Sequence, residues 1–210
     1  MKTFIISLAL ILFSVALFAQ KESEYNYEKD QLAFELCGLY TIDQSIRTPE
    51  IFKLLGRNMI AFDSINFSKF IKFVKKNGFP NKKMVGEHNW SHPSVSGVGF
   101  MYLVHNPNKV ATEYYDLFKT ELEKGNLSPA LFSYALDRYY VSTEGRSYFD
   151  TPYKARTTAN GVCLQDKEKS DKLRKEIGLE PLPQPAFIDC SEMEIKKADM
   201  TKPIIVSVPE

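Results

Sequence analysis

The apolar residues of this chain recur at helical spacing over most of its length. Between positions 27 and 47 they fall every three or four residues, and the pattern stops at Thr48-Pro49, where a helix is expected to end. A second run follows Asp63, with apolar residues on one face and four lysines on the other, until Gly78 ends it. We expect these lysines to form a solvated face of the helix.

The middle of the chain is less regular. The segment from Gly78 to Pro93 starts with turn residues and has no sustained period, so a loop is expected there. Residues 94–105 are apolar almost all round and include Gly97 and Gly99, which fits a central buried helix whose glycines allow a close neighbour. A strand is the alternative, because the valines and the phenylalanine of this run also favour strands.

Helical spacing returns in the second half of the chain. Residues 109–124 predict one helix, and Ser128-Pro129 is typical of the cap and first position of another, which is expected to end near Gly145. A short charged helix is expected over 166–177. Three prolines then predict an extended tail, to which residues 203–208 could add at most an edge strand. The pattern predicts a mainly α fold, a single-domain bundle of about five to six helices with an irregular C-terminal tail.

The N-terminus has the features of a secretory signal peptide. Lys2 precedes an apolar stretch over 4–18, and a polar run starts at Lys21. The stretch is shorter than the ~20 residues that span a bilayer, so an uncleaved anchor is the less favoured alternative. We expect a signal peptide at 1–19, an α-helical domain at 20–182 and the tail at 183–210. The protein is then exported, periplasmic or extracellular, with no membrane span after cleavage.

Composition narrows the class of protein. The 44% hydrophobic residues exclude intrinsic disorder. With 27 Lys+Arg against 26 Asp+Glu, the net charge of +1 gives no general attraction for nucleic acid. We therefore expect no nucleic-acid partner.

Export would place the three cysteines in an oxidising compartment. Cys163 and Cys190 lie 27 positions apart in the irregular C-terminal third, and a disulfide between them would tether it. Cys37 lies in an apolar run and is interpreted as a small buried side chain.

The histidines offer one candidate metal site. His88 and His92 are four residues apart, a spacing that zinc ligands use when they share a helix face. The alternative is a loop of polar side chains around Trp90, and we expect no cofactor, with zinc as the alternative. His105 ends an apolar run, where a backbone carbonyl commonly satisfies a histidine.

Two clusters of charge are candidate sites. Asp43, Gln44 and Arg47 lie together at a helix end, where residues four apart can form an ion pair. Asp137-Arg138 interrupts a strongly apolar helix, and unpaired burial of such charges is costly. They are expected to face a cleft or to form a structural salt bridge.

Polar residues and glycines form a series of short motifs between positions 43 and 182. The series is Asp43-Gln44 with Arg47, Asp63 with Asn66, Gly78-Phe79-Pro80 with Val85-Gly86, His105, Asp137-Arg138, Gly145, and Arg174 with Gly178-Leu179. In order and spacing it resembles the bacterial family called domain of unknown function 6624. The polar members are spread across four predicted helices and would form a site if they converged on one pocket. The resemblance implies no particular reaction or cofactor.

This chain departs from that family in two places. The family usually follows its late glycine with Gln-x-Tyr-Gly-Thr-Gln, whereas residues 146–152 here read Arg-Ser-Tyr-Phe-Asp-Thr-Pro. The segment 88–93 is also longer than usual. An activity shared by the family could therefore be altered in this chain.

Two functions from different classes fit these residues. The first is an exported protein that binds a small ligand or a peptide through a polar cluster between helices. Its candidate ligand-binding residues are Gln44, Arg47, Asn66, Arg138 and Tyr148. The alternative is an exported hydrolase, possibly metal-dependent through His88 and His92. Its candidate catalytic residues are His105, Asp43 and Asp137, and it requires His105 to lie near one of these carboxylates.

Overall fold

Helices make up nearly all of the regular structure of residues 26–198, the part of the chain that this computed structural model describes. The prediction of a mainly α fold is confirmed, but this part contains ten α-helices instead of five to six. The predicted signal peptide and the segment 203–208 lie outside the described residues. None of the described helices is long and apolar enough to cross a membrane.

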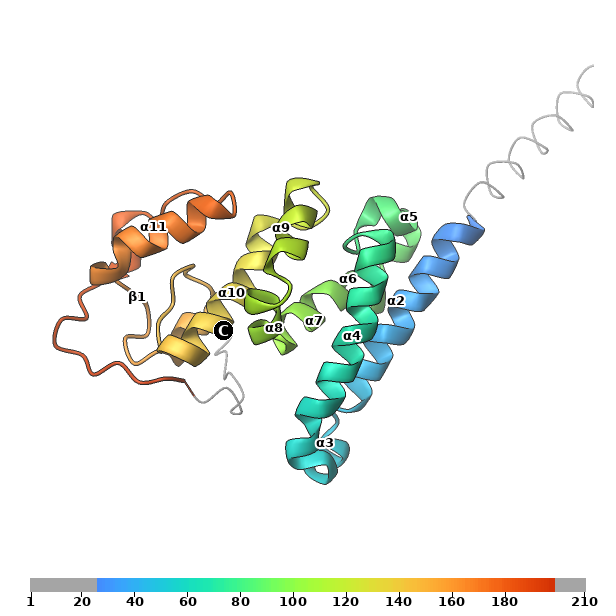
Figure 1. The fold of residues 1–210 in the computed structure, drawn as a ribbon, viewed down its shortest axis with the longest axis horizontal. Helices are drawn as coiled ribbons and strands as arrows, with labels where there is room; N and C mark the ends of the chain where they lie inside the picture. The colour runs from blue at the N-terminus through green and yellow to red at the C-terminus, as the bar shows by residue number, and fades with distance from the viewer. Residues whose placement is uncertain (1–25, 199–210) are drawn as a thin grey trace, which may run out of the picture.

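The helices follow one another with short connections (Figure 1). The first five are α2 (Tyr27–Ser45), α3 (Pro49–Leu55), α4 (Met59–Asn77), α5 (Lys82–Trp90) and α6 (Pro93–Ser96). The next five are α7 (Val98–His105), α8 (Pro107–Thr112), α9 (Tyr115–Glu123), α10 (Pro129–Glu144) and α11 (Lys167–Glu176). The remaining elements are the 3-10 helices η1 (Gly56–Asn58), η2 (Pro152–Arg156), η3 (Leu164–Asp166) and η4 (Gln184–Ala186), and the strands β1 (Val162–Cys163) and β2 (Phe187–Ile188).

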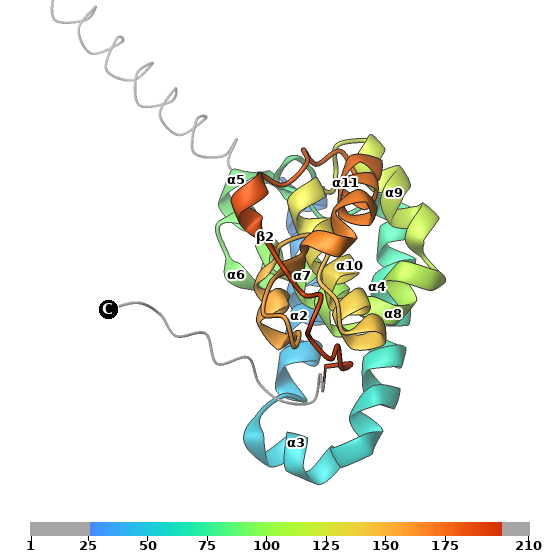
Figure 2. The same ribbon diagram turned by 90° about the vertical axis from the view of Figure 1, so that its left-hand side faces the viewer.

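The long helices α2 and α4 lie side by side at one end of the molecule, with α10 near its middle and α11 on the far side (Figure 1). Figure 2 shows α3 at the foot of α2 and α4, beyond the other helices. One apolar core runs from α2 to Ile177. Its centre is aromatic: the ring of Phe70 stacks on Tyr102 at 4.7 Å between centroids, and Phe79 meets Phe70 edge-on. This core fixes α4 and α7 relative to each other.

Helix α10 begins and ends where its capping residues predict. Ser128 Oγ accepts a hydrogen bond from the Leu131 N–H at 3.2 Å, as expected of the N-cap of α10. Gly145 ends this helix in the left-handed conformation, with φ of 72°. A Cβ there would lie 2.2 Å from the carbonyl oxygen of Lys196, so only glycine fits. The C-terminal segment can therefore lie directly on the end of α10.

The expected loop between Gly78 and Pro93 is wrong, because it contains α5. Asn81 caps this helix by accepting from the Met84 N–H at 3.0 Å. Gly86, with φ of 83°, interrupts its helical geometry. Only Val85 is buried in α5, so the helix has no apolar period that the sequence could reveal.

Two predicted helices are each divided in the structure. The run 94–105 forms α6 and α7, with Gly97 between them, and it is helical and not a strand. The expected close approach occurs at Gly99, where an added Cβ would lie 2.5 Å from the ring of Phe79. Residues 109–124 fall into α8 and α9. Helix α3 was not expected, because it has no buried residue and hence no apolar face toward the core.

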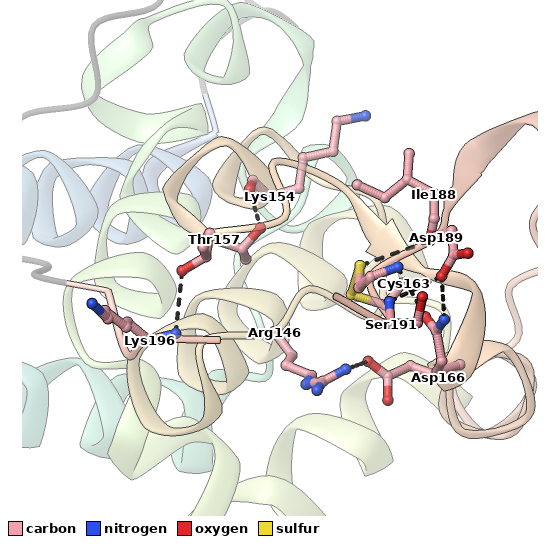
Figure 3. The surroundings of a disulfide bond; sticks show 12 residues. Arg146, Lys154, Thr157, Cys163, Asp166, Ile188, Asp189, Ser191 and Lys196 are labelled. Carbon is pink, nitrogen blue, oxygen red and sulfur yellow. Dashed lines mark hydrogen bonds and ion pairs between the residues drawn. A yellow bond between two sulfur atoms is a disulfide. The ribbon is translucent and has the colours of Figure 1, made fainter. Parts of the chain in front are cut away.

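The C-terminal third is tied together by the predicted disulfide. Cys163 and Cys190 form a bond with their Cα atoms 5.5 Å apart, which confirms the pairing. Strand β1 pairs in parallel with β2, so that Cys163 lies opposite Ile188. An ion pair between Arg146 and Asp166 lies close to the bridge (Figure 3). Cys37 is free and only half-buried.

Replacing both bridged cysteines should destabilise the protein measurably. The Cys163→Ala/Cys190→Ala variant releases a loop of 27 positions, and its free energy of unfolding should fall by about 3 kcal/mol. Urea denaturation followed by circular dichroism measures this. Cys37→Ala is the matched control and should change the value by less than about 1 kcal/mol. Equal effects of the two changes would contradict a structural role for the bridge.

Candidate functional site

A pocket of about 410 Å³ lies between α4, α7, α8 and α10. It is lined by Ile60, Asp63, Ser64, His105, Asn106, Pro107, Asn108, Lys109, Arg138 and Ser142. His105 and Arg138 are therefore brought to one hollow, although 33 positions separate them in the sequence. The four ionisable side chains of the lining come from four helices: Asp63 from α4, His105 from α7, Lys109 from α8 and Arg138 from α10.

His105 is oriented by a buried carboxylate. Its Nδ1 lies 3.0 Å from Oδ1 of Asp43, which is only 1% exposed. Because an ionised carboxylate only accepts hydrogen bonds, Nδ1 carries the hydrogen, and in the neutral imidazole Nε2 then carries the lone pair. Nε2 has no hydrogen-bond partner among residues 26–198. The requirement that the hydrolase hypothesis places on His105 is thus met by Asp43.

The rotation of α7 about its axis, and with it the direction of His105, is set by the core. Tyr102, one turn before His105, donates from its hydroxyl to the Leu39 carbonyl of α2 at 3.0 Å. The same ring stacks on Phe70 of α4. One side chain therefore ties α7 to both neighbouring long helices.

Arg47 joins Asp43 to a second carboxylate. Its Nε and Nη2 donate to the two oxygens of Asp43 at 3.2 and 3.0 Å, and Nη2 also donates to Asp63 Oδ1 at 2.6 Å. Gln44 adds a further hydrogen bond, from Nε2 to Asp43 Oδ2 at 2.7 Å. Asp43 and Arg47 are four residues apart on α2, so they share one face as predicted.

The two carboxylates of this cluster differ in their pKa shifts. Burial alone would raise the pKa of Asp43, but the hydrogen bonds and charges of His105 and Arg47 outweigh it and lower the pKa to about 2. For Asp63, burial outweighs the attraction of Arg47 and raises the pKa. Asp43 is therefore the carboxylate that stays ionised beside His105.

Two cations line the pocket without a carboxylate partner. Lys109 Nζ donates to Ser64 Oγ at 2.7 Å. Arg138 donates to the Tyr153 hydroxyl at 3.2 Å and stacks over the same ring. Within the described part of the chain neither forms an ion pair. Counted with Arg47, they exceed the two carboxylates of the cluster by one charge when His105 is neutral.

Asp137 belongs to a different structure from its neighbour Arg138. It is fully buried, and its oxygens accept from the backbone N–H groups of Tyr148, Phe149 and Thr151 and from two hydroxyls. Burial raises its pKa in spite of these donors. Asp137 is not part of the pocket lining and has no hydrogen bond to His105. Asp137, a candidate catalytic residue, thus lies outside the site, and its hydrogen bonds hold the loop 147–151 in place.

Of the five candidate ligand-binding residues, only Arg138 lines the pocket; Gln44, Arg47, Asn66 and Tyr148 do not. Asn66 is 4% exposed, and its Nδ2 has no hydrogen-bond partner in the described residues. Tyr148 is buried, and its hydroxyl donates to Glu144 Oε2 at 2.6 Å. Gln44 acts on the site through Asp43, as described above.

The two candidate zinc ligands lie away from the pocket. His88 is near the end of α5 and His92 precedes α6, with ring centroids 5.5 Å apart. In residues 26–198 no three His, Cys, Asp or Glu side chains are grouped in a way that could hold a metal ion. Zinc therefore stays a prediction that these contacts do not test.

Sequence reasoning missed most of the residues that line the pocket. Ser64 and Lys109 were not candidates, and Asp63 entered only through the family resemblance. The available signal was proximity: Lys109 follows His105 by four positions across Pro107, and Asp63 begins the apolar and lysine pattern of α4. Neither pattern predicts which face of α4 or α8 lines the pocket.

Comparison of the chain with models of protein families, with curated proteins and with solved structures gives no match. The family resemblance of the sequence therefore stays a prediction.

Removing the Asp43 carboxylate should change how stability depends on pH. Because folding lowers its pKa to about 2, Asp43 stabilises the fold above the unfolded-state pKa near 4, and this contribution is lost as the pH falls from about 4 to 2. Asp43→Asn should reduce the free energy of unfolding at pH 7 by about 2 kcal/mol, with a smaller difference at pH 2.

Denaturant titrations at pH 7, 4 and 2 measure this difference. Asp116→Asn, at an exposed position of α9, is the control and should stay within about 0.5 kcal/mol of wild type. A difference between Asp43→Asn and wild type that is the same at all three pH values would argue against the charged cluster.

Proposed function

We propose that this protein binds a small anionic ligand in the pocket between α4, α7, α8 and α10. The observation that carries the proposal is the pair of cations, Lys109 and Arg138, that line the pocket without a carboxylate partner in the described chain. A cation without a counterion in a partly enclosed site favours an anion there.

The remaining lining supports the same ligand class. A guanidinium offers paired donors to a carboxylate or phosphate, and an ammonium offers a point charge. Asn106 and Asn108 add amide groups to the lining. A volume of about 410 Å³ is within the range of small-molecule sites. With the predicted signal peptide, the protein would meet this ligand outside the cytoplasm.

Anion binding should depend on the two cations and not on basic charge in general. Inorganic phosphate, titrated by calorimetry at low salt, is the probe. Arg138→Gln and Lys109→Gln each remove one charge-assisted contact. Each should weaken phosphate binding, raising the dissociation constant about tenfold or more. Lys72→Gln, on the exposed face of α4, removes the same charge outside the pocket and should bind like wild type. Equal weakening in all three variants would contradict the proposal.

A hydrolase is the second candidate, and the hydrogen bond between Asp43 and His105 favours it specifically. An imidazole held by a carboxylate through Nδ1 can accept a proton from water at Nε2. The resulting hydroxide would attack a carbonyl or phosphoryl centre, and the imidazolium would then protonate the leaving group. Arg138 and Lys109 would stabilise the negative charge that develops. Asp137 has no part in this scheme.

The hydrolase candidate makes a separate prediction. Activity is measured on p-nitrophenyl phosphate and on short p-nitrophenyl esters. His105→Gln should lower kcat about 10²- to 10⁴-fold, while phosphate binding is retained. His88→Gln is the matched histidine control outside the pocket and should keep full activity. Loss of activity in His88→Gln alone would overturn the role of His105 and favour a metal site at His88 and His92.

A further inference from the structure

One wall of the pocket is apolar and open to solvent. Ile60 lines the pocket at the start of α4, yet 76% of its surface is exposed. Asp63 and Ser64 follow it at the three- and four-residue spacing of one helix face. The pocket therefore has a rim where polar lining gives way to hydrocarbon.

Further exposed apolar side chains occur shortly before Ile60 in the chain. Helix α3 leaves Ile51, Phe52 and Leu54 exposed. Phe62 and Ile65 are also exposed, but at about 100° per residue they lie on the face of α4 opposite Ile60. Helix α3 has no buried residue, and both views place it at the foot of α4, beyond the rest of the helices (Figures 1 and 2). Exposed large apolar side chains that form a patch on a soluble protein commonly mark a contact with a ligand or partner.

The two chemistries meet at Ile60. On the inner side, Lys109 and Arg138 supply positive charge; on the outer side, the chain leads back through η1 to the apolar helix α3. An occupant that uses both must carry negative charge at one end and hydrocarbon at the other. Sharing of Ile60 between the pocket and the exposed surface favours one ligand that contacts both over a separate partner for each.

We infer that the ligand is an anionic amphiphile, whose charged head lies between Lys109 and Arg138 and whose hydrocarbon chain leaves the pocket over Ile60 toward α3. This inference rests on the proposed anion site and narrows its ligand class. A head without a chain would leave Ile60 in water, and a chain without a charged head would leave both cations without a counterion.

A series of alkyl phosphates tests the inference. Methyl, butyl and octyl phosphate are titrated by calorimetry below their critical micelle concentrations. Affinity should rise about two- to threefold for each of the first added methylenes, less than full burial gives, because the wall is open on one side. Ile60→Ser should abolish this dependence on chain length, measured as the ratio of octyl to methyl phosphate affinity within the variant. Phe62→Ser, an exposed apolar position on the opposite face of α4 and outside the pocket lining, should keep it.

The outcomes separate the two proposals. If methyl phosphate does not bind, the anion site itself fails. If methyl and octyl phosphate bind equally well, the anion site stands and the amphiphile is excluded. If Ile60→Ser and Phe62→Ser both convert a dimer to a monomer in sedimentation velocity, and chain length has no effect, a second copy of the protein covers this surface and the inference is overturned.

Discussion

A carboxylate that is almost completely buried at the end of α2 constrains the arrangement of the surrounding helices. Asp43 can keep its charge away from water only if both oxygens are met by donors, and these come from three directions: Arg47, Gln44 and His105. Arg47 has donors to spare and binds Asp63 as well. The ends of α2 and α7 and the first half of α4 are thereby held together, and residues of α4 and α7 line one side of the pocket.

A second buried carboxylate, Asp137, accepts no hydrogen bond from a cationic side chain of residues 26–198. Its pKa indicates how the pKa of Asp43 would shift without such partners. Asp137 accepts more hydrogen bonds than Asp43, yet its pKa is raised where that of Asp43 is lowered. The difference lies in the donors, since Asp137 meets neutral hydroxyls and backbone N–H groups, whereas Asp43 meets a guanidinium and an imidazole. One carboxylate therefore organises a loop, and the other organises charge beside a pocket.

Features that depend on residues close together in the sequence could be predicted from it. Features that depend on contacts between distant residues could not. Helix α10, with a serine cap and a final glycine, and the disulfide in the irregular third could be predicted. Helix α5 could not, because it buries one side chain and leaves no period. Asp43 and Arg47 were recognised as a pair from their spacing. The meeting of Asp43 with His105, 62 positions away, and the separate fate of Asp137 depend on how α7 and α10 are rotated, and periodicity does not encode rotation.

The double attachment of Tyr102 has a consequence for how this protein can evolve. A rotation of α7 by one residue turns His105 by about 100° and removes it from Asp43. That rotation is fixed by a core ring and its hydroxyl, on Phe70 and on the Leu39 carbonyl, and not by any group in the pocket. Substitutions in the core and changes in chemistry are therefore coupled. A lineage that repacks its core around α7 alters the site in the same step, so stability and specificity cannot drift independently.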